Sequence, residues 1–160
     1  MIRIIRARDE RGIPTEWDDY PDREIGEVTG RMALRFDSEL MALKTEGLSL
    51  GVRRWTEAVA RIRRFSAEAA EWMARNFGDD STIDEDLRVV ALEEWLSTNP
   101  DYWLAQQVGI WSAVNLAGGA MTLAGLLDLA DRDVENIDDP PPYIPDEDGD
   151  VEGKAEPADS

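Results

Sequence analysis

Residues 102–127 read YWLAQQVGIWSAVNLAGGAMTLAGLL and contain no charged side chain. Large apolar residues recur along this stretch, and the pair Gly118-Gly119 divides it into two parts. Glycine is a weak helix former and commonly follows the last turn of a helix. We therefore expect two helices that meet at the glycine pair, the second of them ending near residue 135.

A charge-free stretch of this length is buried in a core, covered by a partner or inserted in a membrane, where a spanning helix needs about 20 apolar residues. Three features oppose a span, the first of which is that the glycine pair Gly118-Gly119 would break its middle. Gln106 and Gln107 place polar amides in its first half, where insertion is costly. Asp101 and Asp128 flank the stretch, so no basic residue orients it. We therefore expect helices that are buried or covered by a partner.

Two amphipathic helices are predicted before this stretch, over residues 22–46 and about 50–77. Each carries one apolar stripe with steps of three and four residues, and Gly47 is a natural stop between them. The apolar positions are Ile25, Val28, Met32, Phe36, Leu40 and Leu43 in the first helix, and Trp55, Val59, Ile62, Ala69, Met73 and Phe77 in the second.

The polar face of the second helix is rich in arginine, and it is the one basic element of the chain. Three pairs lie at i,i+4 and predict ion pairs along the helix: Glu57/Arg61, Arg64/Glu68 and Glu71/Arg75. We interpret the face as solvated, or as a docking site for the chain's own acidic tail. Nucleic-acid binding is the alternative, and the net charge of −18 opposes it because phosphates are repelled.

A third helix is predicted over residues 82–98, with Ser81 as its cap and Asp84 at the capping-box position. It is apolar around much of its circumference, so we expect it to be central or covered by a partner. Asn99 and Pro100 then predict the start of the next helix.

The N-terminal segment has little helical character. Alternation of isoleucine and arginine over residues 2–6 predicts one short strand. Residues 9–20 resemble a loop, and Asp18 or Asp19 is the expected cap of the following helix, with Pro21 in its first turn.

Charge is concentrated at the C-terminus. Residues 128–160 hold 13 Asp and Glu against Arg132 and Lys154, whereas the other 127 residues hold 22 acids and 15 bases. We predict one helical domain over residues 1–135 and a disordered, acidic, proline-containing tail over 136–160. The segment Pro140–Tyr143 matches a proline-rich ligand motif in form, and we interpret it as stiffening the tail.

The amino-acid composition excludes the catalytic sites that depend on His or Cys. The chain has no His and no Cys, which excludes histidine bases, thiolate nucleophiles and zinc sites built on these residues. The pairs Glu68/Glu71 and Glu24/Glu27 have the spacing of one half of a magnesium-binding helical motif, but no second half follows. The acidic run 146–150 fails the register of a calcium loop. We expect no metal or cofactor, and no enzyme.

The N-terminus lacks the long apolar segment of a secretory signal, so we expect a cytoplasmic location, which is the host cytoplasm if a phage encodes the chain. Acidic character favours protein partners over direct contact with nucleic acid, and self-association stays open.

Residues 40–87 resemble the tail assembly chaperones of tailed phages. A leucine–glycine–leucine–serine turn precedes a tryptophan-bearing helix, and a glycine–acid–acid turn follows it. The residues that carry this resemblance are Leu43, Gly47, Leu48 and Ser49, then Ala69, Trp72, Ala74 and Arg75, then Gly78, Asp79 and Asp80. The resemblance implies a non-catalytic helical protein that coats the tape measure protein and helps recruit tail tube subunits.

We therefore predict an all-α bundle of four to five helices that acts as a protein-binding assembly factor. The expected partner-binding residues are Trp95, Trp103, Trp111, Leu126 and Leu127. Two alternatives stay open. The first is an acidic nucleic-acid mimic that inhibits a host defence protein, and the second is a small membrane protein of the holin kind.

Overall fold

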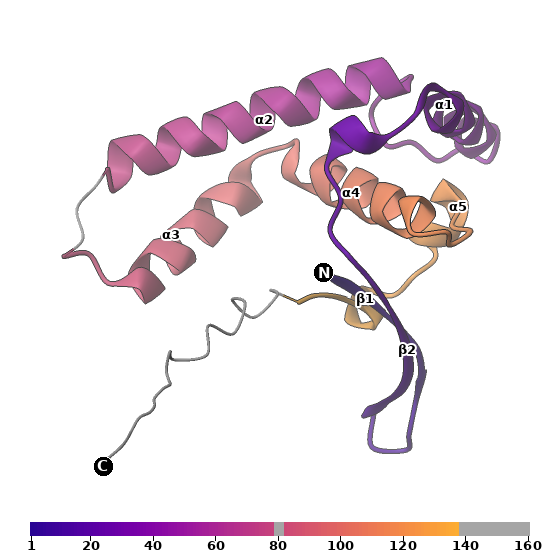
Figure 1. Ribbon diagram of the computed structural model, residues 1–160, viewed down its shortest axis with the longest axis horizontal. Coiled ribbons are helices and arrows are strands. Elements are labelled where there is room, and N and C mark those ends of the chain that lie inside the picture. The colour runs from indigo at the N-terminus through magenta and orange to yellow at the C-terminus, as the bar shows by residue number, and fades with distance from the viewer. Residues whose placement is uncertain (79–81, 138–160) are drawn as a thin grey trace, which may run out of the picture.

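The computed structural model describes residues 1–78 and 82–137. In these ranges the chain forms a helical body, an arm made of two helices, and a projecting β-hairpin (Figure 1). The helices are α1 (Gly30–Thr45), α2 (Trp55–Asn76), α3 (Glu85–Thr98), α4 (Tyr102–Leu116) and α5 (Leu123–Leu127). The fold is mostly helical as predicted, but it also contains a three-stranded sheet, so the all-α prediction is correct only in part.

The first helix begins later than its apolar stripe. Thr29 is extended and accepts a hydrogen bond from the backbone N–H of Met32, so α1 starts at Gly30. Residues Ile25–Glu27 form a separate 3-10 turn, η1. The prediction of a helix from residue 22, capped by Asp18 or Asp19, is therefore wrong. The predicted stop is confirmed: Gly47 has a φ of +81°, which lets the Leu48 N–H reach the Leu43 carbonyl at 2.9 Å.

The next two helix starts also differ from expectation. Asp84 is the cap of α3 and accepts from the N–H of Asp86, while the predicted cap Ser81 lies outside the described residues. At the start of α4 the Asn99 side chain accepts from the N–H of Asp101, and the helix begins at Tyr102 rather than at Pro100. The predicted break at the glycine pair is confirmed by the end of α4 at Leu116.

The N-terminal strand is confirmed and is longer than predicted. It forms β1 (Ile2–Arg8), the central strand of an antiparallel sheet with the order β2-β1-β3. The expected loop over residues 9–20 is instead a tight turn followed by β2 (Pro14–Tyr20). Ion pairs across the strands stabilise the hairpin: Arg3 binds Asp19 through two hydrogen bonds of 2.7 and 2.9 Å, and Arg6 binds Asp18 at 2.8 Å.

The third strand, β3 (Val134–Asn136), pairs with β1 from the other side. A short 3-10 turn, η2 (Asp131–Asp133), leads into it. The predicted helix ending near residue 135 is thus wrong, because α5 ends at Leu127. The Ile137 N–H donates to the Met1 carbonyl at 2.8 Å, so ordered pairing continues just past the predicted domain boundary. The rest of the predicted disordered tail lies outside the described residues.

The core is built around α4, whose Trp111 has no exposed surface. Phe36 of α1 packs edge-on against both Trp55 and Trp111, with ring centroids 5.1 Å apart in each pair. A second cluster joins the sheet to the same helix, since Ile2 and Ile4 pack with Ala113 and Val114. In the described part of the chain, no helix is long and apolar enough to span a bilayer.

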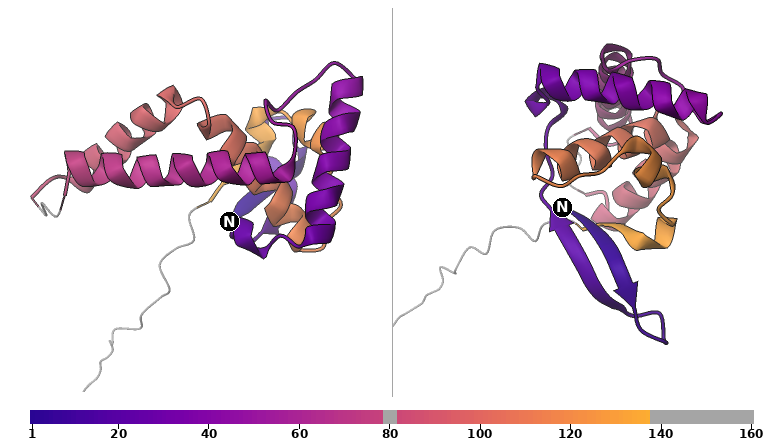
Figure 2. Two further views of the ribbon diagram at one scale, coloured as in Figure 1. Left: turned by 90° about the horizontal axis from the view of Figure 1, so that it is seen from above. Right: turned by 90° about the vertical axis from the view of Figure 1, so that its right-hand side faces the viewer.

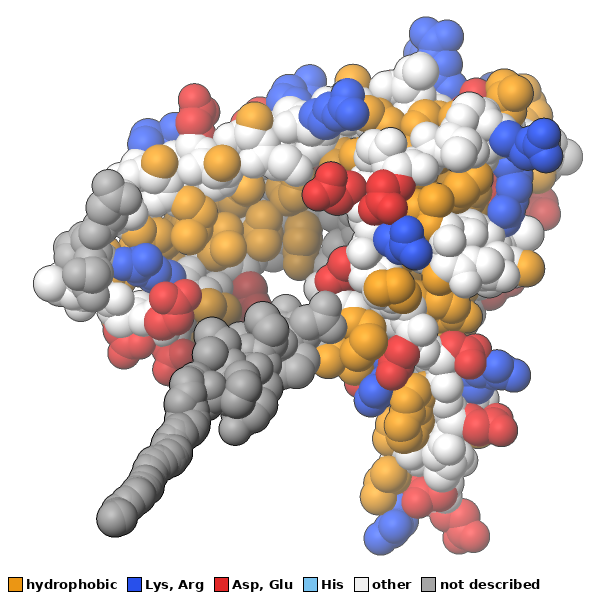
Figure 3. All heavy atoms as spheres, viewed as in Figure 1, with side chains coloured by type: hydrophobic (Ala, Val, Ile, Leu, Met, Phe, Trp, Pro, Cys, Tyr) orange, Lys and Arg blue, Asp and Glu red, His pale blue; other side chains and the backbone are white. Residues whose placement is uncertain are grey.

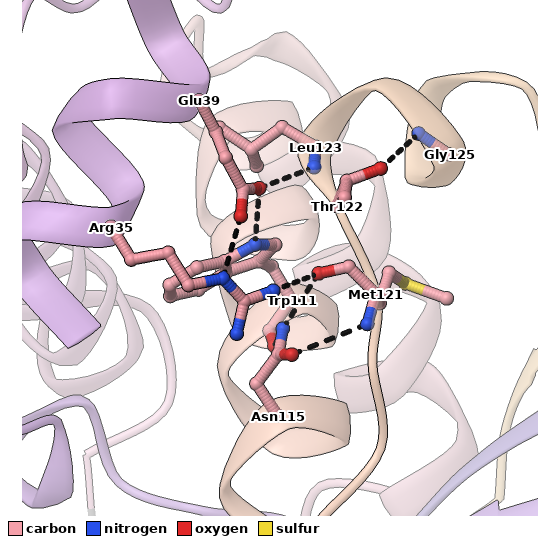
Figure 4. A network of polar contacts seen from close by, with 8 residues as sticks. All are labelled: Arg35, Glu39, Trp111, Asn115, Met121, Thr122, Leu123 and Gly125. Atoms are coloured by element: carbon pink, nitrogen blue, oxygen red, sulfur yellow. Dashed lines mark hydrogen bonds and ion pairs between the residues drawn. The ribbon is translucent and has the colours of Figure 1, made fainter.

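A polar network inside the body connects α1, α4 and the loop before α5 (Figure 4). The Glu39 carboxylate accepts from the Trp111 indole N–H at 3.0 Å, from the Leu123 N–H at 2.7 Å and from Arg35 at 2.7 Å. Arg35 also donates to the Met121 carbonyl, and the Asn115 amide bonds both backbone groups of Met121. One carboxylate therefore accepts hydrogen bonds from donors in three segments.

The substitution Glu39→Gln is expected to lower the free energy of unfolding by about 1–3 kcal/mol, because the amide cannot accept from all three donors. Urea denaturation followed by circular dichroism measures this loss. The control is Glu46→Gln at the exposed end of α1, which should leave the transition unchanged. Equal stabilities for the Glu39 variant and the wild type would contradict the role assigned to this network.

The loop after α4 has no room for a side chain at Gly119. A Cβ atom there would lie 2.6 Å from Val114 Cγ1 and 2.9 Å from the Val114 carbonyl oxygen. Gly119→Ala is therefore expected to destabilise the protein by about 1–3 kcal/mol through overpacking. Gly30→Ala is the matched control, since nothing lies within 4 Å of its Cβ position. It should be neutral or stabilising by up to about 1 kcal/mol. Thermal melts of the two variants separate these outcomes.

Candidate functional site

The arm carries several of the exposed apolar side chains of the described chain. It consists of the C-terminal half of α2 and the whole of α3, which folds back beside it. Figure 2 shows α1 crossing the N-terminal end of α2, while the other end of α2 extends well beyond the body. In the space-filling view, hydrophobic side chains line the hollow between the two arm helices (Figure 3).

Aromatic rings hold the arm together. Trp95 of α3 stacks on Trp72 of α2 with a centroid distance of 5.5 Å, and it also faces Phe65 at 6.3 Å. Phe77 meets Trp72 edge-on at the far end. No residue of α3 is buried, whereas α2 buries three side chains. The second arm helix is therefore attached through a few large rings rather than through a closed core.

The outer face of α3 carries an apolar patch in an acidic setting. The α3 patch consists of Leu87 and Val90, which lie one helical turn apart on the same face and have exposed fractions of 64% and 62%. Exposed acids lie on the same helix around it: Glu85, Asp86, Glu93 and Glu94. Exposed apolar side chains that cluster within a charged rim are typical of protein-binding surfaces.

The arm is anchored at its base by a buried carboxylate. The side chain of Asp101 is 8% exposed and accepts from Arg61 at 2.5 and 3.0 Å and from Arg64 at 3.4 Å. Two of the three ion pairs predicted along α2 are therefore wrong, because these arginines turn toward Asp101 instead. Glu71 and Arg75 do lie within 3.8 Å of each other. Long-range pairing prevails here because a buried carboxylate needs partners more than an exposed one does.

The five residues predicted to bind a partner lie in different places. Trp95 belongs to the arm, and Trp103 lies on α4 with 47% of its surface exposed. Trp111 and Leu126 are core residues, with exposed fractions of 0% and 3%, and the half-buried Leu127 packs against the same core. They form no common surface in this structure, and partner binding by Trp95 and Trp103 stays a prediction.

The exposed residues of the α3 patch were not on the list of expected binding residues. The sequence did indicate that such residues exist, because a helix that is apolar around its whole circumference must be covered on more than one side. The sequence did not indicate which of its apolar residues face α2. Only the ring contacts of Trp95 decide that orientation, and they leave Leu87 and Val90 outside.

Within residues 1–78 and 82–137, no three acidic side chains are placed to hold a metal ion together. No family model matches the chain, and no curated protein or solved structure shows significant similarity to it. The arm combines a hollow between two helices, exposed apolar side chains and negative charge. Surfaces of this kind bind other proteins.

The substitution Asp101→Asn is expected to loosen the base of the arm, because the amide retains one acceptor for two guanidinium groups. Amide hydrogen exchange in α3 should become at least several-fold faster, while exchange around Phe36 and Trp111 stays slow. Mass spectrometry of the exchanged protein measures both regions. Glu71→Gln, which removes only an exposed ion pair, is the control and should change neither region.

Proposed function

We propose that this chain is a non-catalytic assembly factor that binds other proteins, and more specifically a tail assembly chaperone of a tailed phage. In this role it holds the tape measure protein and brings tail tube subunits to it. The resemblance of residues 40–87 supports the family. Its glycine–leucine–serine turn lies between α1 and α2, and its tryptophan motif lies in the arm half of α2.

The observation that carries the proposal is the incomplete burial of α3. A helix with Leu87 and Val90 more than 60% exposed leaves apolar surface in water, which a partner can cover at a gain of about 25 cal/mol per Å². Such surface suits a chaperone, because the apolar segments of an unassembled partner need a temporary cover.

Charge indicates the chemistry of the partner. Glu93, Glu94 and Asp86 surround the α3 patch, so the complementary ligand is an amphipathic helix whose apolar stripe is flanked by Lys or Arg. Apolar residues at i and i+3 on α3 match a helix lying alongside it. We therefore assign a basic-flanked helical segment of the tape measure protein to this surface.

The proposal is tested with the tape measure and tail tube proteins encoded in the same gene neighbourhood. Each is co-expressed with the full chain, and binding is measured by affinity capture and then by titration calorimetry. The variant Leu87→Ser/Val90→Ser should bind the tape measure protein at least tenfold more weakly, a loss of about 1.4 kcal/mol or more. Its circular dichroism spectrum should match that of the wild type.

The matched control is Leu34→Ser/Met41→Ser, which removes two equally exposed apolar side chains from α1. It should bind like the wild type. Equal weakening in both variants would show that general stickiness, not the α3 patch, drives binding. Failure to bind either tail protein overturns the proposal. Capture of a DNA-binding protein or nuclease that high salt releases would replace it with the nucleic-acid mimic.

A further inference from the structure

The outer face of α1 is a second exposed apolar surface, and the proposed function makes no use of it. Leu34 and Met41 are 71% and 66% exposed, the two largest fractions among the exposed large apolar side chains of the described residues. They lie two helical turns apart, on the side of α1 opposite to the buried Phe36 and Leu43. The exposed Ser38 lies between them. Leu34, Ser38 and Met41 are called the α1 patch below.

The charge around the α1 patch is opposite to the charge around the α3 patch. Arg31 and Lys44 flank the α1 patch, one toward each end of the helix, and both are exposed. Asp86, Glu93 and Glu94 lie beside the α3 patch and are also exposed. Within residues 1–78 and 82–137, none of these five side chains forms a hydrogen bond or an ion pair. Unpaired charges of opposite sign favour contact between the two surfaces.

The two patches also match in shape. The apolar side chains of the α1 patch are seven residues apart, which is about 10 Å along the helix axis, and the short side chain of Ser38 leaves a gap between them. Leu87 and Val90 are about 4.5 Å apart along α3, so this ridge fits the gap, as in the packing of two helices. In an antiparallel contact, which the helix dipoles favour, Asp86 lies toward Lys44 and the acids that follow the ridge lie toward the start of α1.

The two patches lie too far apart to meet within one chain. Figure 2 shows α1 across one end of α2, whereas α3 lies beside the other end. The 22 residues of α2 separate these ends by about 33 Å. The contact therefore joins α1 of one copy to α3 of another. Such an interface is heterologous, because each copy contributes a different surface and keeps one patch free.

We propose that the α1 patch of one copy binds the α3 patch of a second copy, and that this head-to-tail contact covers the apolar side chains of the free protein. Two large side chains from each helix bury much less than the roughly 1,200 Å² of a stable interface, so the association is weak and reversible. The self-association stands on these surfaces alone.

One consequence rests on the proposed function: the tape measure protein and a second copy compete for the α3 patch. Because the self-association is weak, the chain is monomeric at the low concentrations of a binding titration. The variant Leu34→Ser/Met41→Ser therefore still binds the tape measure protein like the wild type. At high concentration, an excess of the tape measure protein should dissociate the self-associated species.

The experiment is sedimentation velocity of the full chain alone, over roughly 10 μM to 1 mM, the range in which weak complexes dissociate. About 0.15 M salt screens the repulsion of the net charge of −18 beyond about 8 Å. The average mass of the wild type should rise above that of one chain as concentration increases. Leu34→Ser/Met41→Ser and Leu87→Ser/Val90→Ser should each stay monomeric. Their equimolar mixture should form dimers and nothing larger, because one intact pair of patches remains.

Charge reversal tests the ion pairs separately. Arg31→Glu/Lys44→Glu should stay monomeric, and so should Asp86→Lys/Glu93→Lys/Glu94→Lys, because the patches of each variant then carry charges of the same sign. An equimolar mixture of these two variants should associate again, since each reversed patch meets a patch of opposite charge on the other variant. The recovery also shows that both variants are folded.

The control is Ile13→Ser, which removes an exposed apolar side chain from the hairpin and should associate like the wild type. A wild type that is monomeric at the highest concentration overturns the proposal. Dimers of either serine variant alone also overturn it, because the interface would then join identical patches. A monomeric mixture of the serine variants would place the contact elsewhere. Because only this chain is measured, none of these outcomes depends on whether the tape measure protein binds.

Discussion

The structure depends on satisfying one partly buried carboxylate. Glu39 accepts hydrogen bonds from the Trp111 indole, from the Leu123 backbone and from Arg35, and these donors belong to three separate segments. Trp111 is completely buried, so its N–H needs an acceptor that the apolar core cannot provide. The same contact that completes the core therefore sets how α1, α4 and the start of α5 lie relative to one another.

Two parts project from this well-connected body, and they are held in different ways. The hairpin of β1 and β2 is stabilised by paired charges on an exposed face. The arm is stabilised by stacked rings and by Asp101 at its base. Elements with little buried surface open most readily, and a surface that adapts to a partner is expected to lie in such an element. The division into a rigid body and a lightly attached arm is thus consistent with a binding protein.

Sequence patterns predicted the elements that are determined by residues close together in the chain. The stripe through Phe36, Leu40 and Leu43 identified α1, and the glycine pair marked the end of α4. Patterns failed for β2, because its residues Pro14–Tyr20 face water on most sides and show no apolar alternation. That strand is defined by its backbone pairing with β1, and the arginines of β1 add ion pairs to Asp18 and Asp19. For the candidate site, the sequence predicted only that the helix over residues 82–98 needs a cover. It did not predict which residues of that helix stay exposed.

The sequence by itself determined that residues 102–127 need a cover, since a charge-free stretch with several large apolar residues cannot face water on all sides, and the tertiary structure decided that α4 lies in the core. It also determined that His and Cys chemistry are absent. Only the tertiary structure decided which acid receives Arg61 and Arg64 and which side of α3 stays outside. These features arise between residues far apart in the sequence, where periodicity carries no information and burial selects the partner.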